Sequence, residues 1–132
     1  MNARPQAWLS QANNDLAMAR LATDNGFHAQ ACYFAAQAAE KALKGALLEL
    51  GREPPHTHVL PDLVAALRDQ GVDVDELVEL PLKALTRMTI TSRNPIDATP
   101  PSELFESSDA VQALATAGAV IALLERLDQP AP

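Results

Sequence analysis

Residues 33–50 read Tyr-Phe-Ala-Ala-Gln-Ala-Ala-Glu-Lys-Ala-Leu-Lys-Gly-Ala-Leu-Leu-Glu-Leu and predict a helix that is apolar on two sides. At about 100° per residue, its apolar side chains fall into two groups that project in roughly opposite directions. One group comprises Cys32, Ala36, Ala39, Leu43, Leu47 and Leu50, and the other comprises Phe34, Ala38, Ala42 and Gly45. We expect the rest of the domain and a partner chain to cover these two faces. Between them lies a narrow polar arc, a candidate site, formed by Gln37, Glu40, Lys41 and Lys44.

The remaining sequence predicts further helices and no strands, because alanine and leucine dominate it and runs of β-branched residues are few. Helical periodicity and stop signals place helices at 6–24, 27–50, about 61–70, about 74–91 and about 107–127. The fourth contains Pro81, which predicts a kink or a break. Residues 92–105 are rich in Pro, Ser and Thr and predict a loop. The predicted fold is all-α, a five-helix antiparallel up-and-down bundle.

The length of 132 residues predicts a single domain, 1–132, with a core at about 5–127 and a frayed tail at 128–132. The single cysteine, Cys32, cannot form an internal disulfide, which is typical of a reducing cytoplasm. Its place on an apolar face predicts a small core residue. We see no signal peptide and no apolar run near the roughly 18 residues of a membrane span. We therefore expect a cytoplasmic protein without a membrane partner.

The charge balance argues against one class of function. A net charge of −7 and a pI of about 4.8 disfavour broad, charge-driven binding to DNA. Aromatic residues make up 4% of the chain, too few for a set of base-stacking platforms. A small basic pocket on an acidic protein is compatible with both numbers.

Four segments occur in an order that resembles the HEPN family, over about residues 5–127. They are Trp8 to Ala19, Ala-Gln-Ala-Ala-Glu-Lys-Ala-Leu-Lys at 36–44, His58-Val59-Leu60, and Ser92-Arg93-Asn94-Pro95. The resemblance implies a helical bundle that forms a homodimer. It also implies a minimal nucleotidyltransferase as partner, in a two-gene pair of the toxin–antitoxin kind. Some members of the family are metal-independent ribonucleases, in which an Arg is followed by a polar residue and, a few positions on, by a His.

The chain departs from this ribonuclease motif at its histidine. Arg93 and Asn94 match the first two positions, but no histidine occurs after His58. Because His is the usual side chain that transfers protons near neutral pH, the family's catalytic residue has no counterpart here. We therefore lean against an enzyme. If the chain does cleave RNA, we expect Arg93, Asn94 and Asp97 to carry the reaction.

The polar arc admits three interpretations, and the sequence alone leaves them open; two assign it a role, and the third is a plain solvated face. In the first, Gln37 and Glu40 form a buried polar network with Arg93, which locks the following loop onto the helix; Lys44, at i+4, can also pair with Glu40. In the second, Lys41, Lys44 and Arg93 form a pocket for the phosphate of a nucleotide or an RNA.

The remaining polar motifs indicate neither a metal nor a cofactor. His56-Thr57-His58 has no third Cys or His close in sequence, so we expect His58 to cap or to pack. The small residues at 38, 42 and 45 predict a close helix contact, within the chain or in a dimer. The leading hypothesis is an interaction module that binds a nucleotide or RNA. The alternatives are a degenerate ribonuclease toxin and a purely structural dimer without a ligand.

Overall fold

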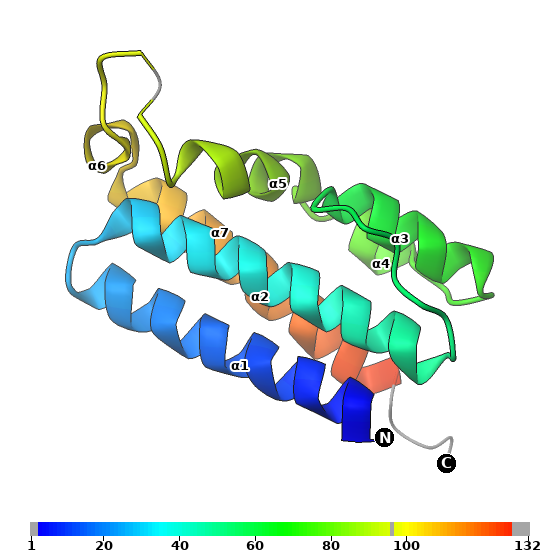
Figure 1. Cartoon of the computed structure of the whole chain (residues 1–132). Helices are drawn as coiled ribbons and strands as arrows, with labels where there is room; N and C mark the ends of the chain where they lie inside the picture. Colours follow the sequence, from blue (N-terminus) through cyan, green and yellow to red (C-terminus); the bar gives the residue numbers. More distant parts are fainter. Residues whose placement is uncertain (1–2, 96, 128–132) are drawn as a thin grey trace.

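The computed structural model describes residues 3–95 and 97–127, which form a bundle of helices joined by short connections (Figure 1). The described residues contain seven helices and no strand. The helices are α1 (Ala3–Asp24), α2 (His28–Glu49), α3 (Leu60–Asp69), α4 (Asp75–Val78), α5 (Leu82–Thr91), α6 (Pro101–Leu104) and α7 (Ser107–Leu127). The all-α fold and the four helices predicted outside the Pro81 region are confirmed, with ends shifted by a few residues at most.

The helix count differs from the predicted five for two reasons, and both involve proline. Pro81 breaks the predicted fourth helix into α4 and α5, because proline lacks the N–H that a helix interior needs. The prediction of a loop over 92–105 is wrong at α6, a single turn with Pro101 in its first turn. Proline suits that position because its fixed φ is helical and its missing N–H has no partner there.

Helix α2 lies at the centre of the bundle and is covered on both apolar faces. Figure 1 shows α1 antiparallel beside it, α7 behind it, and α3 and α5 along the edge away from α1. The buried residues of α2 come from both predicted groups: Cys32, Ala36, Ala38, Ala39, Ala42, Leu43, Gly45 and Leu47. Leu50 and Phe34 are less covered than predicted. Both faces are thus buried by helices of the same chain, so their burial does not require the partner chain that the sequence suggested.

Gly45 explains how closely α1 approaches α2. A Cβ atom at this position would lie 3.1 Å from Cβ of Trp8 and 3.5 Å from the carbonyl oxygen of Pro5. The first distance is shorter than an ordinary van der Waals contact, so glycine is the residue that allows the present spacing. The small-residue face at Ala38, Ala42 and Gly45 is therefore a packing surface within the chain.

Helix α7 differs from the expectation that no apolar run approaches the length of a membrane span. Among the described residues, Ser107–Arg126 is long and apolar enough to meet a length and composition criterion for a membrane span. Its apolar side chains form part of the protein core: Ala110, Ala117, Val120 and Leu124 are buried inside the bundle. Figure 1 shows it packed along α2. A core helix meets the same criterion, so it is weak evidence for a membrane.

We predict that one substitution, Gly→Ala, has different effects at two helical sites. Gly118 lies inside α7 and an added Cβ would meet nothing within 4 Å. Gly118→Ala should therefore raise the free energy of unfolding by about 0.5–1 kcal/mol through helix propensity. Gly45→Ala should give no such gain, because its Cβ meets Trp8. Denaturant unfolding of both variants measures the difference, and equal stabilisation at both sites would contradict the close α1–α2 packing.

Candidate functional site

The polar arc of α2 is built on a buried carboxylate from α1. The Asp15 side chain is 6% exposed, and its carboxylate accepts hydrogen bonds from two side chains. Lys41 of α2 donates through Nζ to Oδ2, and Gln11 donates through Nε2 to Oδ1 at 2.9 Å. The Lys41 side chain itself is 27% exposed. A buried carboxylate needs such partners because it has lost its hydration. Asp15 therefore holds the Lys41 ammonium in one place at the edge of the arc.

Glu40 is the second buried carboxylate of the arc, and it contacts two nitrogen-bearing side chains. Lys44 Nζ lies 3.1 Å from Oε2, which is the i,i+4 pair that the sequence predicted. His58 Nδ1 lies 2.9 Å from Oε1. The His58 side chain is 72% exposed, while the Glu40 side chain is 7% exposed. The contact thus attaches the loop before α3 to the middle of α2, and it leaves most of the imidazole facing solvent.

Arg93 follows α5 and contacts α2 at Tyr33, before the first residue of the arc. Its Nε donates to the carbonyl oxygen of Thr89 at 3.1 Å, and its guanidinium lies over the Tyr33 ring, 5.2 Å from the centroid. This is the geometry of a cation–π contact. Arg93 is exposed, and in the part of the chain that the structure describes it pairs with no carboxylate. Its partners therefore leave the outer side of the guanidinium open to a ligand.

The structure does not bring Arg93 and Glu40 together. Tyr33 and Glu40 are seven residues apart on α2, which is about 10 Å along the axis. Arg93 contacts the first, and the partners of Glu40 are Lys44 and His58. Gln37 lies between them, half-buried, and its side chain makes no hydrogen bond with the described residues. The network predicted from Gln37, Glu40 and Arg93 therefore does not form: Arg93 and Glu40 have separate partners, and Gln37 contacts neither through a hydrogen bond.

The other residues of the degenerate ribonuclease motif lie in the turn after α5. Asn94 and Asp97 are exposed, and neither side chain forms a hydrogen bond within 3–95 and 97–127. Asp97 has φ of 58°, in the left-handed region that Asn and Asp tolerate better than most residues. Both side chains are therefore open to solvent, and neither is held in place by a contact with Arg93 among the described residues.

Cys32 adds no reactive thiol to this site. Burial raises the pKa of the Cys32 thiol to about 12, with a smaller contribution from the charge of Asp109. The thiol therefore stays protonated at neutral pH, as a core cysteine does. Within the described residues, no three His, Cys, Asp or Glu side chains gather as metal ligands.

Three members of the site were missed by the sequence reasoning. Asp15 is 26 residues from Lys41, His58 is 18 residues from Glu40, and Tyr33 contacts Arg93 across two helices. A partial signal existed for one of them, because a carboxylate between two apolar residues of a helix stripe is expected to need a cation. The pairings themselves depend on how the helices dock.

The comparison with protein families agrees with this fold. The HEPN domain family matches residues 5–127, so the chain belongs to the HEPN family. The resemblance predicted from the four motifs is confirmed. None of the curated proteins compared with the chain matches it.

Solved structures share the fold along nearly the whole chain. TT1696 from Thermus thermophilus is 35% identical, with a TM-score of 0.86 over 96% of this chain and 98% of that one. ST0689, described as an archaeal HEPN homologue, is 23% identical, with a TM-score of 0.73 over 95% and 98%. A HEPN domain protein from Thermotoga maritima is 22% identical, with a TM-score of 0.70 over 92% and 96%. The last two show the fold alone.

We predict that Glu40 and Lys44 are strongly coupled in stability. Glu40→Leu leaves the Lys44 ammonium, whose side chain is 13% exposed, without its carboxylate. We expect the free energy of unfolding to fall by about 3 kcal/mol, as when one partner of a buried pair is removed. Adding Lys44→Met should restore most of this loss, because an apolar pair can replace a buried ion pair. Urea unfolding measures the cycle, and strictly additive losses would show that the two side chains are independent.

Proposed function

We propose that this HEPN protein is a cytoplasmic interaction module that binds a nucleotide or the phosphate of an RNA, with Arg93 as its main contact. The observation that carries the proposal is the placement of Arg93. Its guanidinium is exposed, lies over Tyr33 and has no carboxylate partner in the described residues. A guanidinium held in this way can pair with a phosphate through two N–H groups and can stack on a base.

The two lysines of the arc have a smaller part in this proposal than Arg93. Lys41 is bound to Asp15, and Lys44 is bound to Glu40. Each pair is nearly neutral, so neither lysine offers an unbalanced charge to a phosphate. Lys41 is the more exposed of the two, at 27% against 13%. We assign Lys41 and Lys44 chiefly to the scaffold of the arc, and Lys41 to secondary contact with a long ligand.

A ribonuclease is the second candidate function, and the contact between Glu40 and His58 supports it. A carboxylate on Nδ1 fixes the orientation of an imidazole, which is how many proton-transferring histidines are held. The His58 ring is exposed on its other side. It lies at the Glu40 level of α2, however, about 10 Å along the axis from the level of Arg93. This spacing supports binding as the primary function.

We propose a homodimer and a minimal nucleotidyltransferase as the assembly in which the module acts, as one half of a toxin–antitoxin-like pair. Exposed apolar side chains at the α1–α2 turn support an interface. Met18, Leu21 and Phe27 are 42%, 57% and 58% exposed, and with Phe34 they line a shallow hollow. Apolar groups gathered in this way typically mark a contact surface between proteins.

We predict that Arg93→Ala weakens binding of ATP and of a single-stranded oligouridine by about tenfold or more, because a hydrogen bond to a charged group is lost. Isothermal titration without added metal measures both affinities. Arg93→Lys should recover only part of the affinity, since an ammonium lacks the planar fork. Arg68→Ala is the matched control, because Arg68 is an exposed arginine of α3 and its loss changes the net charge equally.

Two results of this experiment would contradict the proposal. Equal affinity in the wild type and in Arg93→Ala, or no binding by either, would favour a structural dimer without a ligand. Shortening of the oligouridine by the wild type, abolished in Arg93→Ala, would favour the ribonuclease instead.

We predict that the purified chain has about twice the 14.1 kDa mass of one copy when measured by light scattering. Leu21→Glu should shift the protein toward the monomer, because a charge in an apolar interface loses its hydration without gaining a partner. Circular dichroism of the variant checks that the helices remain. Monomeric mass for the wild type would refute the proposed homodimer, and an unaltered dimer in Leu21→Glu would place the interface elsewhere.

A further inference from the structure

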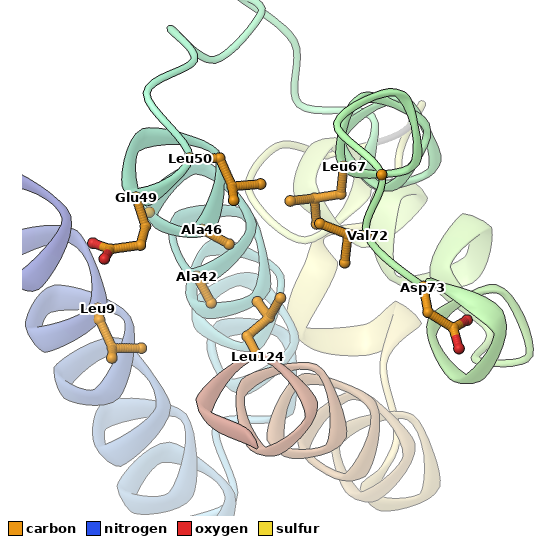
Figure 2. Close-up of a pocket in the computed structure, with 11 residues that line it drawn as sticks. Leu9, Ala42, Ala46, Glu49, Leu50, Leu67, Val72, Asp73 and Leu124 are labelled. Atoms are coloured by element: carbon orange, nitrogen blue, oxygen red, sulfur yellow. The ribbon is translucent and has the colours of Figure 1, made fainter. Parts of the chain in front are cut away.

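One end of the bundle contains an apolar cavity of about 300 Å³, between α1, α2, α7 and the turn that follows α3. Figure 2 shows Leu9, Ala46, Leu67, Val72 and Leu124 around it. Its volume lies at the lower end of the range for small-molecule sites. Gly45, which also lines it, is twelve residues from Tyr33 on α2, or about 18 Å along the axis. The cavity is therefore separate from the Arg93 site.

The cavity follows from the small side chains of α2 at this end. Ala42, Gly45 and Ala46 form its α2 wall, and α1 packs closely against this wall at Gly45, through Trp8. The leucines contributed by α3 and α7 do not fill the remaining space. An occupant would consequently meet mostly methyl and methylene groups, so its body must be apolar.

Glu49 is the charged residue of α2 that lines this cavity. Its Oε2 atom is buried and forms no hydrogen bond with the described residues. A buried carboxylate oxygen without a donor is uncommon, because it loses hydration without compensation. The arginines nearby are engaged elsewhere: Arg4 pairs with Glu53, and Arg52 donates to the carbonyl oxygen of Ala66. The carboxylate of Glu49 thus lacks a cation partner within the described part of the chain.

Asp73 adds a second negative charge on the opposite wall. Its Oδ1 accepts a hydrogen bond from the backbone N–H of Asp75 at 3.0 Å. Figure 2 shows its carboxylate turned away from the hollow, while the Glu49 carboxylate lies on the α1 side of α2. Asp73 therefore contributes to the field of the cavity rather than to a contact. Both charges repel an anion and attract a cation.

We propose that this cavity binds a small organic cation, an alkyl or aryl body that carries a primary ammonium group. The apolar body occupies the space between α2, α3 and α7, and the ammonium group lies at the α1 edge as the missing donor to the Glu49 carboxylate. The segment 128–132 of this chain, Asp-Gln-Pro-Ala-Pro, has no cationic side chain and so lacks this complementarity. The site is independent of the function proposed for Arg93.

The proposal is tested with three probes of equal length: n-hexylamine, n-hexanol and hexanoate. Each is titrated into the ¹⁵N-labelled protein at pH 7, and amide shifts are followed by NMR. We expect hexylamine to shift the amides of Gly45, Ala46 and Val72 and to bind more tightly than hexanol, with hexanoate weakest. Glu49→Gln should weaken hexylamine by about tenfold, to the level of hexanol, because a charge-assisted hydrogen bond is lost.

Two further variants keep the test specific. Glu103→Gln removes the same charge from an exposed residue of α6 that does not line the cavity, and should leave the affinity for hexylamine unchanged. Ala46→Leu fills the cavity and should abolish binding of both hexylamine and hexanol, while the remaining amide spectrum shows an intact fold. The proposal is refuted if hexanoate binds as well as hexylamine, or if Glu49→Gln changes nothing. Shifts at the cavity that follow protein concentration instead of amine would assign it to a second copy and would also overturn the proposal.

Discussion

The burial of two opposite apolar faces of α2 determines where the surrounding helices pack. Thirteen of its 22 residues are buried, so covering one face would leave a second apolar surface in water. Helix α1 covers one side and α7 another, and α3 and α5 follow the remaining edge (Figure 1). Gly45 allows α1 to pack closely against α2 at Trp8. Helices α1, α3, α5, α6 and α7 thus all contact α2, and the polar arc lies on the part of its surface that they leave accessible.

The polar arc is organised by charge balance. Asp15 and Glu40 are buried carboxylates, and each holds one lysine of α2. These pairs place both lysines where their charges are already compensated. Arg93 differs because its contacts are a carbonyl oxygen and an aromatic ring, which fix its position without neutralising it. In a chain of net charge −7, this difference leaves Arg93 as a cation beside the arc whose charge is not balanced by a carboxylate among the described residues.

More of the fold than of the site could be predicted from the sequence, because helices follow from local signals whereas the contacts of the site join residues that are distant in sequence. Helix positions follow from local periodicity and from stop signals such as Gly26, Gly51 and Gly71, which have positive φ after α1, α2 and α3. The Glu40–Lys44 pair is also local. The contacts of Asp15 with Lys41 and of His58 with Glu40 depend on tertiary docking, which spacing along the chain does not encode. The same holds for Arg93, which reaches Tyr33 instead of Glu40, and for the cavity beside Glu49.

The dependence of α2 on α7 has a consequence for the order of folding. Helices α1 and α2 are neighbours in the chain and can pair as soon as both exist, since a short connection closes at little entropic cost. Helix α7 begins at Ser107, more than fifty residues after the end of α2 at Glu49. During synthesis, the α7-facing surface of α2 is therefore without its cover until the last helix has left the ribosome. The nascent chain exposes an alanine- and leucine-rich surface throughout that interval, and the docking of α7 is the step that ends its vulnerability to aggregation.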